Sequence, residues 1–117
     1  EMKKRLMAIR EDFLIVADDL TVTNPAPVQA AAKEEAANAI IIKPNQIGSL
    51  TETMECIRKA QELGWKIIVS HRSGETCDDF IADLAVAVGA EFLKSGSLSR
   101  GERLAKYNRL MEIEGEI

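Results

Sequence analysis

Short apolar runs alternate along the chain with longer segments that have the apolar spacing or the composition of a helix. The apolar runs predict strands over residues 13–17, 39–42, 65–69 and 91–93. The segments that follow predict helices over residues 25–37, 49–63, 76–88 and 99–113, and residues 1–9 predict the end of an earlier helix. Continuous apolar strands that alternate with helices are typical of a parallel sheet that is buried on both faces. The pattern therefore predicts an α/β fold of four strand–loop–helix units.

Residues with capping preferences support these helix boundaries. Asn24 precedes Pro25, which suits the first helical position. Three pairs have the spacing of a capping box: Ser49 with Glu52, Thr76 with Asp79, and Ser99 with Glu102. Gly64 and Gly89 are expected to end the second and third helices.

The four units recur at a period of about 25 residues. Eight such units close a TIM barrel of roughly 250 residues, so this chain supplies half of a barrel. An open doubly wound sheet is the alternative. That fold usually has a glycine-rich phosphate turn after its first strand, and residues 18–21 contain no glycine.

The third strand ends in the most distinctive stretch of the sequence, SHRSGET at residues 70–76. Arg72 can bind a phosphate or carboxylate through two parallel N–H groups, and Ser73 can donate from its hydroxyl. Gly74 allows a close approach of the backbone, whose N–H groups at a strand-to-helix turn favour an anion. An ordinary polar turn with a helix cap at Thr76 is the simpler explanation. We favour an anion site, because groups of different chemistry, His71 among them, fall together at one strand end.

Each predicted strand is followed by an ionisable residue: Asp18, Lys43, His71 and Lys94. In a barrel the carboxyl ends of all strands point to one mouth, so these residues should converge with Arg72 and Ser73. A cap or a solvated side chain would explain any one of them, but not the whole set.

The expected convergence suggests acid–base chemistry. Lys43 and Lys94 would face one cavity, where mutual repulsion and burial lower the pKa of one lysine enough to make it a neutral base. Asp18 offers an oxygen ligand for Mg²⁺, although one carboxylate alone does not fix a metal. Together with a phosphate site, these groups fit the abstraction of a proton next to a carboxylate.

Composition excludes several other classes of protein. The net charge is −4 and 46% of the residues are hydrophobic, which is globular and argues against a nucleic-acid partner. No apolar run approaches the ~20 residues of a membrane span. Cys56, expected in the core, and Cys77 lack metal-ligand spacing, and a single histidine excludes a multi-histidine metal site. We expect a protein of the reducing cytoplasm.

Several stretches together resemble the C-terminal part of enolase, the phosphopyruvate hydratase of glycolysis. They are ADDLTVTNP at 17–25, IIKPNQIGSLTET at 41–53, SHRSGET at 70–76, FIADLAVA at 80–87 and LKSGSLSRGERLAKYN at 93–108. The resemblance implies that residues 1–117 are the C-terminal half of an enolase-type barrel domain. It also implies a cytoplasmic, Mg²⁺-dependent homo-oligomer, a dimer, that dehydrates 2-phosphoglycerate to phosphoenolpyruvate.

The resemblance also assigns roles by position. It implies that Lys43 is the base that removes the C2 proton, that Asp18 binds Mg²⁺, that Arg72 and Ser73 bind the substrate phosphate, that His71 lines the pocket, and that Lys94 binds the substrate carboxylate. Two positions depart from the family: Cys77, where a glutamate is usual, and Ser95, where a threonine is common.

In the family, the general-acid glutamate, two metal carboxylates and a small N-terminal domain precede this region. We therefore expect a fragment of a full enolase that does not catalyse alone. Two alternatives remain open. One is a half barrel that dimerises and binds phosphorylated acids or a protein partner without catalysis. The other is a Schiff-base aldolase that uses Lys43 or Lys94.

Overall fold

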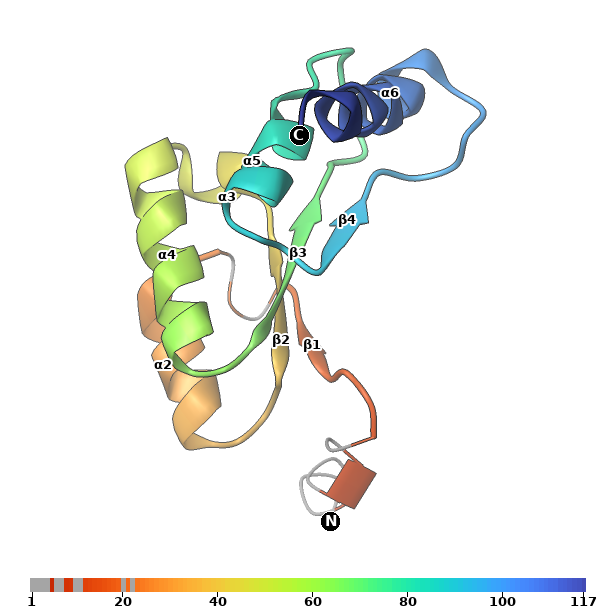
Figure 1. Cartoon of the computed structure of the whole chain (residues 1–117). Coiled ribbons are helices and arrows are strands. Elements are labelled where there is room, and N and C mark those ends of the chain that lie inside the picture. Colours follow the sequence, from red (N-terminus) through yellow and green to blue (C-terminus); the bar gives the residue numbers. More distant parts are fainter. Residues whose placement is uncertain (1–4, 6–7, 10–11, 20, 22) are drawn as a thin grey trace. The chain divides into compact units, whose positions relative to one another are not determined.

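The computed structural model describes residues 5, 8–9, 12–19, 21 and 23–117, which belong to two units, Glu1–Ile67 and Ile68–Ile117. Most of the helix predicted over residues 1–9 lies outside the described residues. Figure 1 labels the elements of both units, each of which is considered by itself. Every helix in the described part of the chain is too short or too polar to cross a lipid bilayer.

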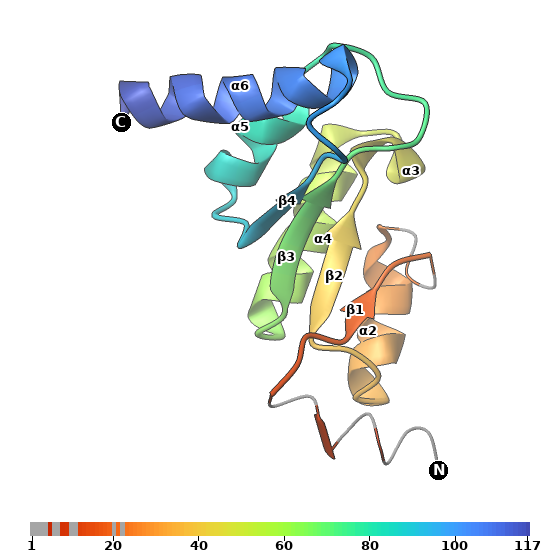
Figure 2. The same ribbon diagram turned by 90° about the vertical axis from the view of Figure 1, so that its right-hand side faces the viewer.

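From residue 12 on, the described part of the first unit contains two paired strands and the helices α2, α3 and α4. Strand β1 (Val16–Ala17) pairs in parallel with β2 (Ala39–Ile42), with Val16 opposite Ala39. All four residues of β2 are buried, as the continuous apolar run predicts. Helices α2 (Pro25–Lys33) and α4 (Leu50–Glu62) lie side by side on one face of β2, and α3 (Pro44–Ile47) precedes α4 (Figure 2).

The N-termini of α2 and α4 form as predicted. The Asn24 side chain accepts a hydrogen bond from the Ala26 N–H at 3.0 Å. Ser49 accepts from the Glu52 N–H at 3.3 Å, and its hydroxyl donates to the Glu52 carboxylate. The face that α4 buries consists of Thr53, Cys56, Ile57 and Ala60. Burial raises the pKa of the Cys56 thiol to about 11, so this cysteine is the core residue that we expected.

Other boundaries in this unit differ from the prediction. The first strand is shorter than residues 13–17, because the Asn38 side chain replaces backbone pairing there. It accepts from the Ile15 N–H at 2.6 Å and donates to the Phe13 carbonyl at 2.9 Å. Helix α2 ends at Lys33 and not at residue 37. The predicted loop after β2 contains α3, which starts at Pro44 and stops at Gly48, whose φ is 93°.

The second unit contains two paired strands and two helices. Strand β3 (Lys66–Ser70) begins in the first unit, where the Lys66 N–H donates to the Asn38 carbonyl at 3.0 Å. In the second unit it pairs in parallel with β4 (Phe92–Lys94), with Ser70 opposite Lys94. Helix α5 (Phe80–Ala87) packs against α6 (Gly101–Glu116) and β4. The sheet order is β1-β2-β3-β4, so the prediction of a parallel α/β sheet in chain order is confirmed.

The capping boxes predicted for the last two helices are wrong. Helix α5 starts at Phe80, and its first N–H is accepted by Asp78 at 3.0 Å, while Thr76 accepts from the Asp78 N–H at 3.3 Å. Helix α6 starts at Gly101 without a side-chain cap, because the Ser99 hydroxyl accepts a hydrogen bond from Ser97 at 3.2 Å. Short polar side chains in a turn have several backbone and hydroxyl partners within reach. Here Thr76 and Ser99 form hydrogen bonds within their turns and do not cap the helices.

Candidate functional site

Asp18 and Lys43, which follow neighbouring strands, meet in the first unit. Lys43 Nζ donates to Asp18 Oδ1 and, at 3.2 Å, to Asp19 Oδ1. The Lys43 side chain is 11% exposed and that of Asp18 is 37% exposed. The predicted convergence at the carboxyl ends of β1 and β2 is therefore confirmed for this pair.

The protonation state of Lys43 differs from our expectation. Its pKa is raised, chiefly by the hydrogen bond to Asp18, while burial lowers it and Asp19 adds a smaller upward contribution. The expectation that one of the two lysines is neutral near pH 7 is therefore not met at Lys43. The reason is that two carboxylates stabilise the ammonium more than burial disfavours it.

Two threonines of the loop after β1, Thr21 and Thr23, are buried, and Thr23 joins this loop to the segment after β2. The Thr23 hydroxyl accepts from the Lys43 N–H at 3.0 Å and donates to the Gln46 side chain at 2.9 Å. Thr23 has a φ of 46°, an uncommon conformation for a β-branched residue. The Thr21 hydroxyl donates to the Asp18 carbonyl at 3.0 Å. Sequence reasoning missed both threonines, although two threonines within a loop that carries a charged strand end were a signal.

The other predicted site residues, His71, Arg72, Ser73 and Lys94, belong to the second unit. The His71 N–H donates to the Lys94 carbonyl at 2.9 Å, so the ends of β3 and β4 meet as predicted. The loop after β3 closes on itself, because the Arg72 N–H donates to Glu75 Oε1 at 2.7 Å. The convergence of these residues with Asp18 and Lys43 stays a prediction.

Arg103 and Lys106 of α6 hold this loop, and sequence reasoning gave neither of them a role. Arg103 Nη1 donates to His71 Nδ1 and, at 2.8 Å, to the Arg72 carbonyl, and Nη2 donates to the Ser73 carbonyl at 3.1 Å. Lys106 is fully buried and donates to the Thr76 carbonyl at 2.6 Å. The residues that α6 buries are Arg103, Lys106 and Ile113. Two cations on the same helix face as a core isoleucine were the signal that could have identified them.

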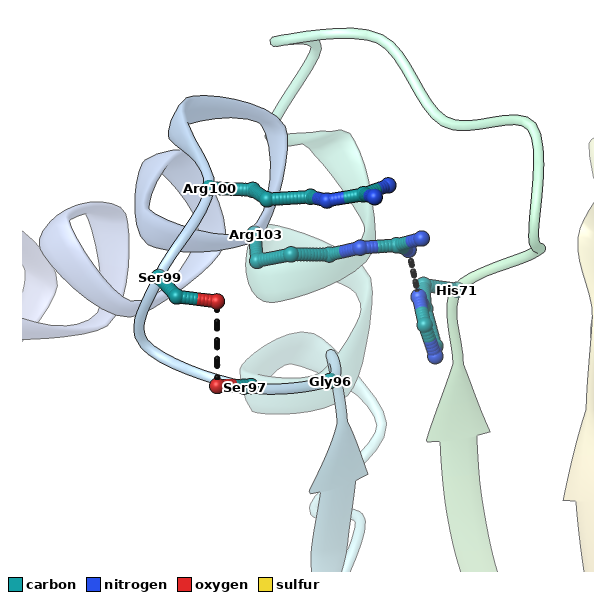
Figure 3. Close-up of a pocket in the computed structure, with 6 residues that line it drawn as sticks. All are labelled: His71, Gly96, Ser97, Ser99, Arg100 and Arg103. Atoms are coloured by element: carbon teal, nitrogen blue, oxygen red, sulfur yellow. Dashed lines mark hydrogen bonds between the residues drawn. The ribbon is translucent and has the colours of Figure 1, made fainter.

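A cavity of about 210 Å³ opens beside the His71–Arg103 contact. Figure 3 shows its lining, which consists of His71, Gly96, Ser97, Ser99, Arg100 and Arg103. Every ionisable side chain in this lining is a base, the two serines can donate, and the lining contains no acid. The composition suits an anion such as a phosphate or a carboxylate.

The pKa shifts of His71 and Glu75 agree with an anion site in the second unit. Burial, followed by the positive charge of Arg103, lowers the pKa of His71, so its imidazole is neutral at neutral pH. Burial alone would raise the pKa of Glu75, but hydrogen bonds from the Arg72 N–H and from Lys106 outweigh it and hold that pKa below its usual value. Glu75 is therefore ionised, and its charge is balanced by Lys106 of α6 at 2.9 Å.

Comparison with known proteins identifies the family. The sequence model of the enolase C-terminal TIM barrel domain matches residues 2–117. The chain belongs to the enolase family. The resemblance noted from the sequence, and the barrel fold that it implies, are thereby confirmed.

Curated relatives of this chain are named enolase. Enolase 2 of Methanospirillum hungatei is 59% identical over 99 residues, which are 85% of this chain and 23% of that protein. Enolase 1 of Entamoeba histolytica is 57% identical over 106 residues, 91% of this chain and 24% of that protein. Enolase 1 of Methylococcus capsulatus is 50% identical over 115 residues, 98% of this chain and 27% of that protein. The chain thus spans about a quarter of the length of these relatives.

Proposed function

We propose that the protein to which this sequence belongs is a phosphopyruvate hydratase, a lyase that dehydrates 2-phosphoglycerate to phosphoenolpyruvate. Residues 1–117 then form four consecutive strand–helix units of its catalytic barrel. Membership of the enolase family supports the proposal. The observation that carries it is the contact between Lys43 and Asp18 at the carboxyl ends of two adjacent parallel strands, where barrel enzymes hold their catalytic groups.

In this proposal Lys43 removes the C2 proton of the substrate. Its main chain is held by Thr23 and its ammonium by Asp18, so the nitrogen has one defined position. Orientation of this kind accounts for a large share of catalytic rate. Lys43 becomes a base when the Asp18 carboxylate is engaged by another partner, because the hydrogen bond to Asp18 is the largest cause of its raised pKa.

The second unit supplies the groups that hold the substrate's anionic ends. Arg72 and Ser73 bind the phosphate, His71 lines the pocket and Lys94 binds the carboxylate. Support comes from the anchoring of the loop: Arg103, Lys106 and Glu75 fix its carbonyls and one of its N–H groups. Donors that are fixed before the substrate arrives stabilise charge without reorganisation during the reaction.

Magnesium is the cofactor that this proposal requires. Asp18 fits as one ligand, since it offers a hard carboxylate oxygen at the strand end and is partly exposed. The described residues contain no group of three or more His, Cys, Asp or Glu side chains that could hold a metal, so Asp18 is the only ligand that we assign. Bound there, Mg²⁺ would stabilise the negative charge that develops on the substrate carboxylate.

The remaining parts of the proposal follow from the family. They are a role in glycolysis, a cytoplasmic location, and assembly into a homo-oligomer, a dimer. A Schiff-base aldolase is a weaker candidate, because membership of the enolase family supports a lyase that uses its lysine as a base.

Turnover of 2-phosphoglycerate by the full-length protein tests the proposal. We expect Mg²⁺-dependent formation of phosphoenolpyruvate, which Lys43→Ala abolishes. Lys59→Ala is the control, because Lys59 pairs with Glu62 at 3.1 Å on the surface of α4. A purified protein that binds 2-phosphoglycerate without turnover would favour the binding-module alternative.

A further inference from the structure

Arg103 contacts three successive residues of the loop after β3. Its guanidinium reaches His71 through the side chain, and Arg72 and Ser73 through their carbonyl oxygens. Arg103 is only 8% exposed. Glu102 of α6 lies at 4.0 Å from Arg103 Nε, and the other three partners are all in the loop. A buried arginine with this set of partners is bound to the loop and is not available as a solvated charge.

The contact with His71 determines which nitrogen of the imidazole carries a proton. A guanidinium has N–H donors and no acceptor. Its bond to Nδ1 therefore requires a lone pair on Nδ1, and in a neutral imidazole the proton is then on Nε2. Figure 3 shows the ring with one nitrogen toward Arg103 and the other turned away from it. The nitrogen that Arg103 leaves open is thus an N–H donor.

Gly96 packs closely against this pair on one side. Gly96, after β4, has a φ of 78° and lies against both side chains. A Cβ at this position would lie 3.2 Å from Arg103 Cδ and 3.3 Å from His71 Cε1. The glycine lets three segments, from β3, β4 and α6, meet at the pair.

The charges that face His71 keep the ring neutral. Arg103 and Lys106 come from α6 and Lys94 from β4, and all three disfavour a second proton on the ring. Glu75, in the same loop, acts in the opposite direction. Burial is the largest cause, and together with the three cations it outweighs the effect of Glu75, so the pKa of His71 is lowered.

We propose that Arg103 is a positioning residue that fixes His71 as the neutral imidazole with its proton on Nε2, so that His71 offers an anionic ligand a hydrogen-bond donor and not a base. The tautomer follows from contacts within the second unit. Only the naming of the ligand as 2-phosphoglycerate rests on the proposed function.

NMR measures the tautomer without any assay of activity. His71 is the only histidine of the sequence, so its two ring nitrogens can be observed in long-range ¹H–¹⁵N spectra without ambiguity. We expect a protonated Nε2 and an unprotonated Nδ1 at neutral pH. Arg103→Gln should give a mixture of tautomers, whereas Arg100→Gln, which changes the other arginine of the cavity, should not. Predominance of the Nδ1–H form, or an equal mixture, in the unmodified chain would overturn the proposal.

Kinetics of the full-length protein separate a donor from a base. His71→Gln keeps an N–H group near the position of Nε2, and His71→Leu removes it. We expect His71→Leu to raise KM for 2-phosphoglycerate by about tenfold to a hundredfold, as for loss of a hydrogen bond to a charged group, and His71→Gln to restore most of the binding. Equal loss of kcat in both variants would contradict the donor role. Absence of turnover in the unmodified protein would instead refute the proposed function, and the NMR result would still decide the tautomer.

Discussion

Lys106 of α6 is fully buried and pairs with Glu75 of the loop after β3 at 2.9 Å. Its three donors are satisfied by this carboxylate and by the carbonyls of Thr76 and Glu102. A buried ammonium with a complete set of partners is tolerated, and the removal of one partner leaves part of its charge uncompensated. The pair therefore links the stability of the second unit to the conformation of the anion-binding loop.

Glu75→Gln tests this link. We expect it to reduce the free energy of unfolding by about 1–3 kcal/mol, because it removes the carboxylate that faces a buried ammonium. Glu62→Gln is the matched control. Glu62 pairs with Lys59 on the surface of α4, and its loss should change stability by no more than about 0.5 kcal/mol. Urea unfolding measures both values, and equal effects would show that the Glu75 pair is no more important than a surface pair.

The same carboxylate predicts a pH dependence. The folded state holds the pKa of Glu75 below its ordinary value of 4.5, so an unfolded chain binds its proton first as the pH falls. The stabilisation is present above pH 4.5 and is lost as the pH falls through the lowered pKa of the folded state. Unfolding measured between pH 6 and pH 3 should show a shallower decline in Glu75→Gln than in the unmodified protein. Parallel curves would contradict the assignment of Glu75 to this loss.

Much of the architecture could be predicted, because continuous apolar segments of the sequence form the buried strands of the sheet. The run Ala39–Ile42 is apolar at every position, and it forms the fully buried strand β2. The meeting of Asp18 with Lys43 followed from the rule that parallel strands end at one edge. Helix α3 was missed, because four residues between a proline and a glycine give too short a pattern to distinguish from a loop.

The supports of the site could not be predicted in the same way. Arg103 and Lys106 bond to carbonyls 30 and 31 positions earlier in the sequence, and carbonyl groups leave no signature in a sequence. Charged residues on helices are usually solvated, so composition alone places them on the surface. The raised pKa of Lys43 also depends on a contact, with Asp18, whose strength only the folded structure reveals.

Gly96→Ala should destabilise the second unit through a specific collision. The new Cβ would press against Arg103 and His71 at 3.2–3.3 Å, in addition to the strain of a φ of 78°. Gly89→Ala is the control, because Gly89 has a φ of 63° and open space around its Cβ position. We expect about 1 kcal/mol of destabilisation for Gly89→Ala and 1–3 kcal/mol more, roughly, for Gly96→Ala, measured by urea unfolding. Equal losses of stability in the two variants would mean that the Arg103 and His71 side chains move aside for the new Cβ without a loss of free energy.

The 117-residue chain alone should not form phosphoenolpyruvate from 2-phosphoglycerate. Its described residues provide one assigned metal ligand, Asp18, and no acidic cluster that could complete a metal site. General acid–base assistance, worth about 10²–10⁴-fold, requires a partner acid for Lys43 that we do not identify among these residues. The measurement is phosphoenolpyruvate formation with and without Mg²⁺. Robust Mg²⁺-dependent turnover by the homogeneous chain would show that it holds a complete site.

Lys43→Arg in the full-length protein separates the two roles that the structure gives to this position. Arginine keeps the positive charge and can still pair with Asp18, so the fold of the loop should be retained. Its guanidinium does not lose a proton near neutral pH, so it cannot serve as the base. In the same protein, we expect exchange of the C2 proton of 2-phosphoglycerate with solvent to fall at least as far in Lys43→Arg as in Lys43→Ala, with little change in stability. Arg72→Ala is the contrasting variant, and it should raise KM, because the phosphate that Arg72 binds changes little during the reaction.

Normal C2 exchange in Lys43→Arg would contradict the role of Lys43. The base would then have to be another residue, and Lys94 would be the first to examine.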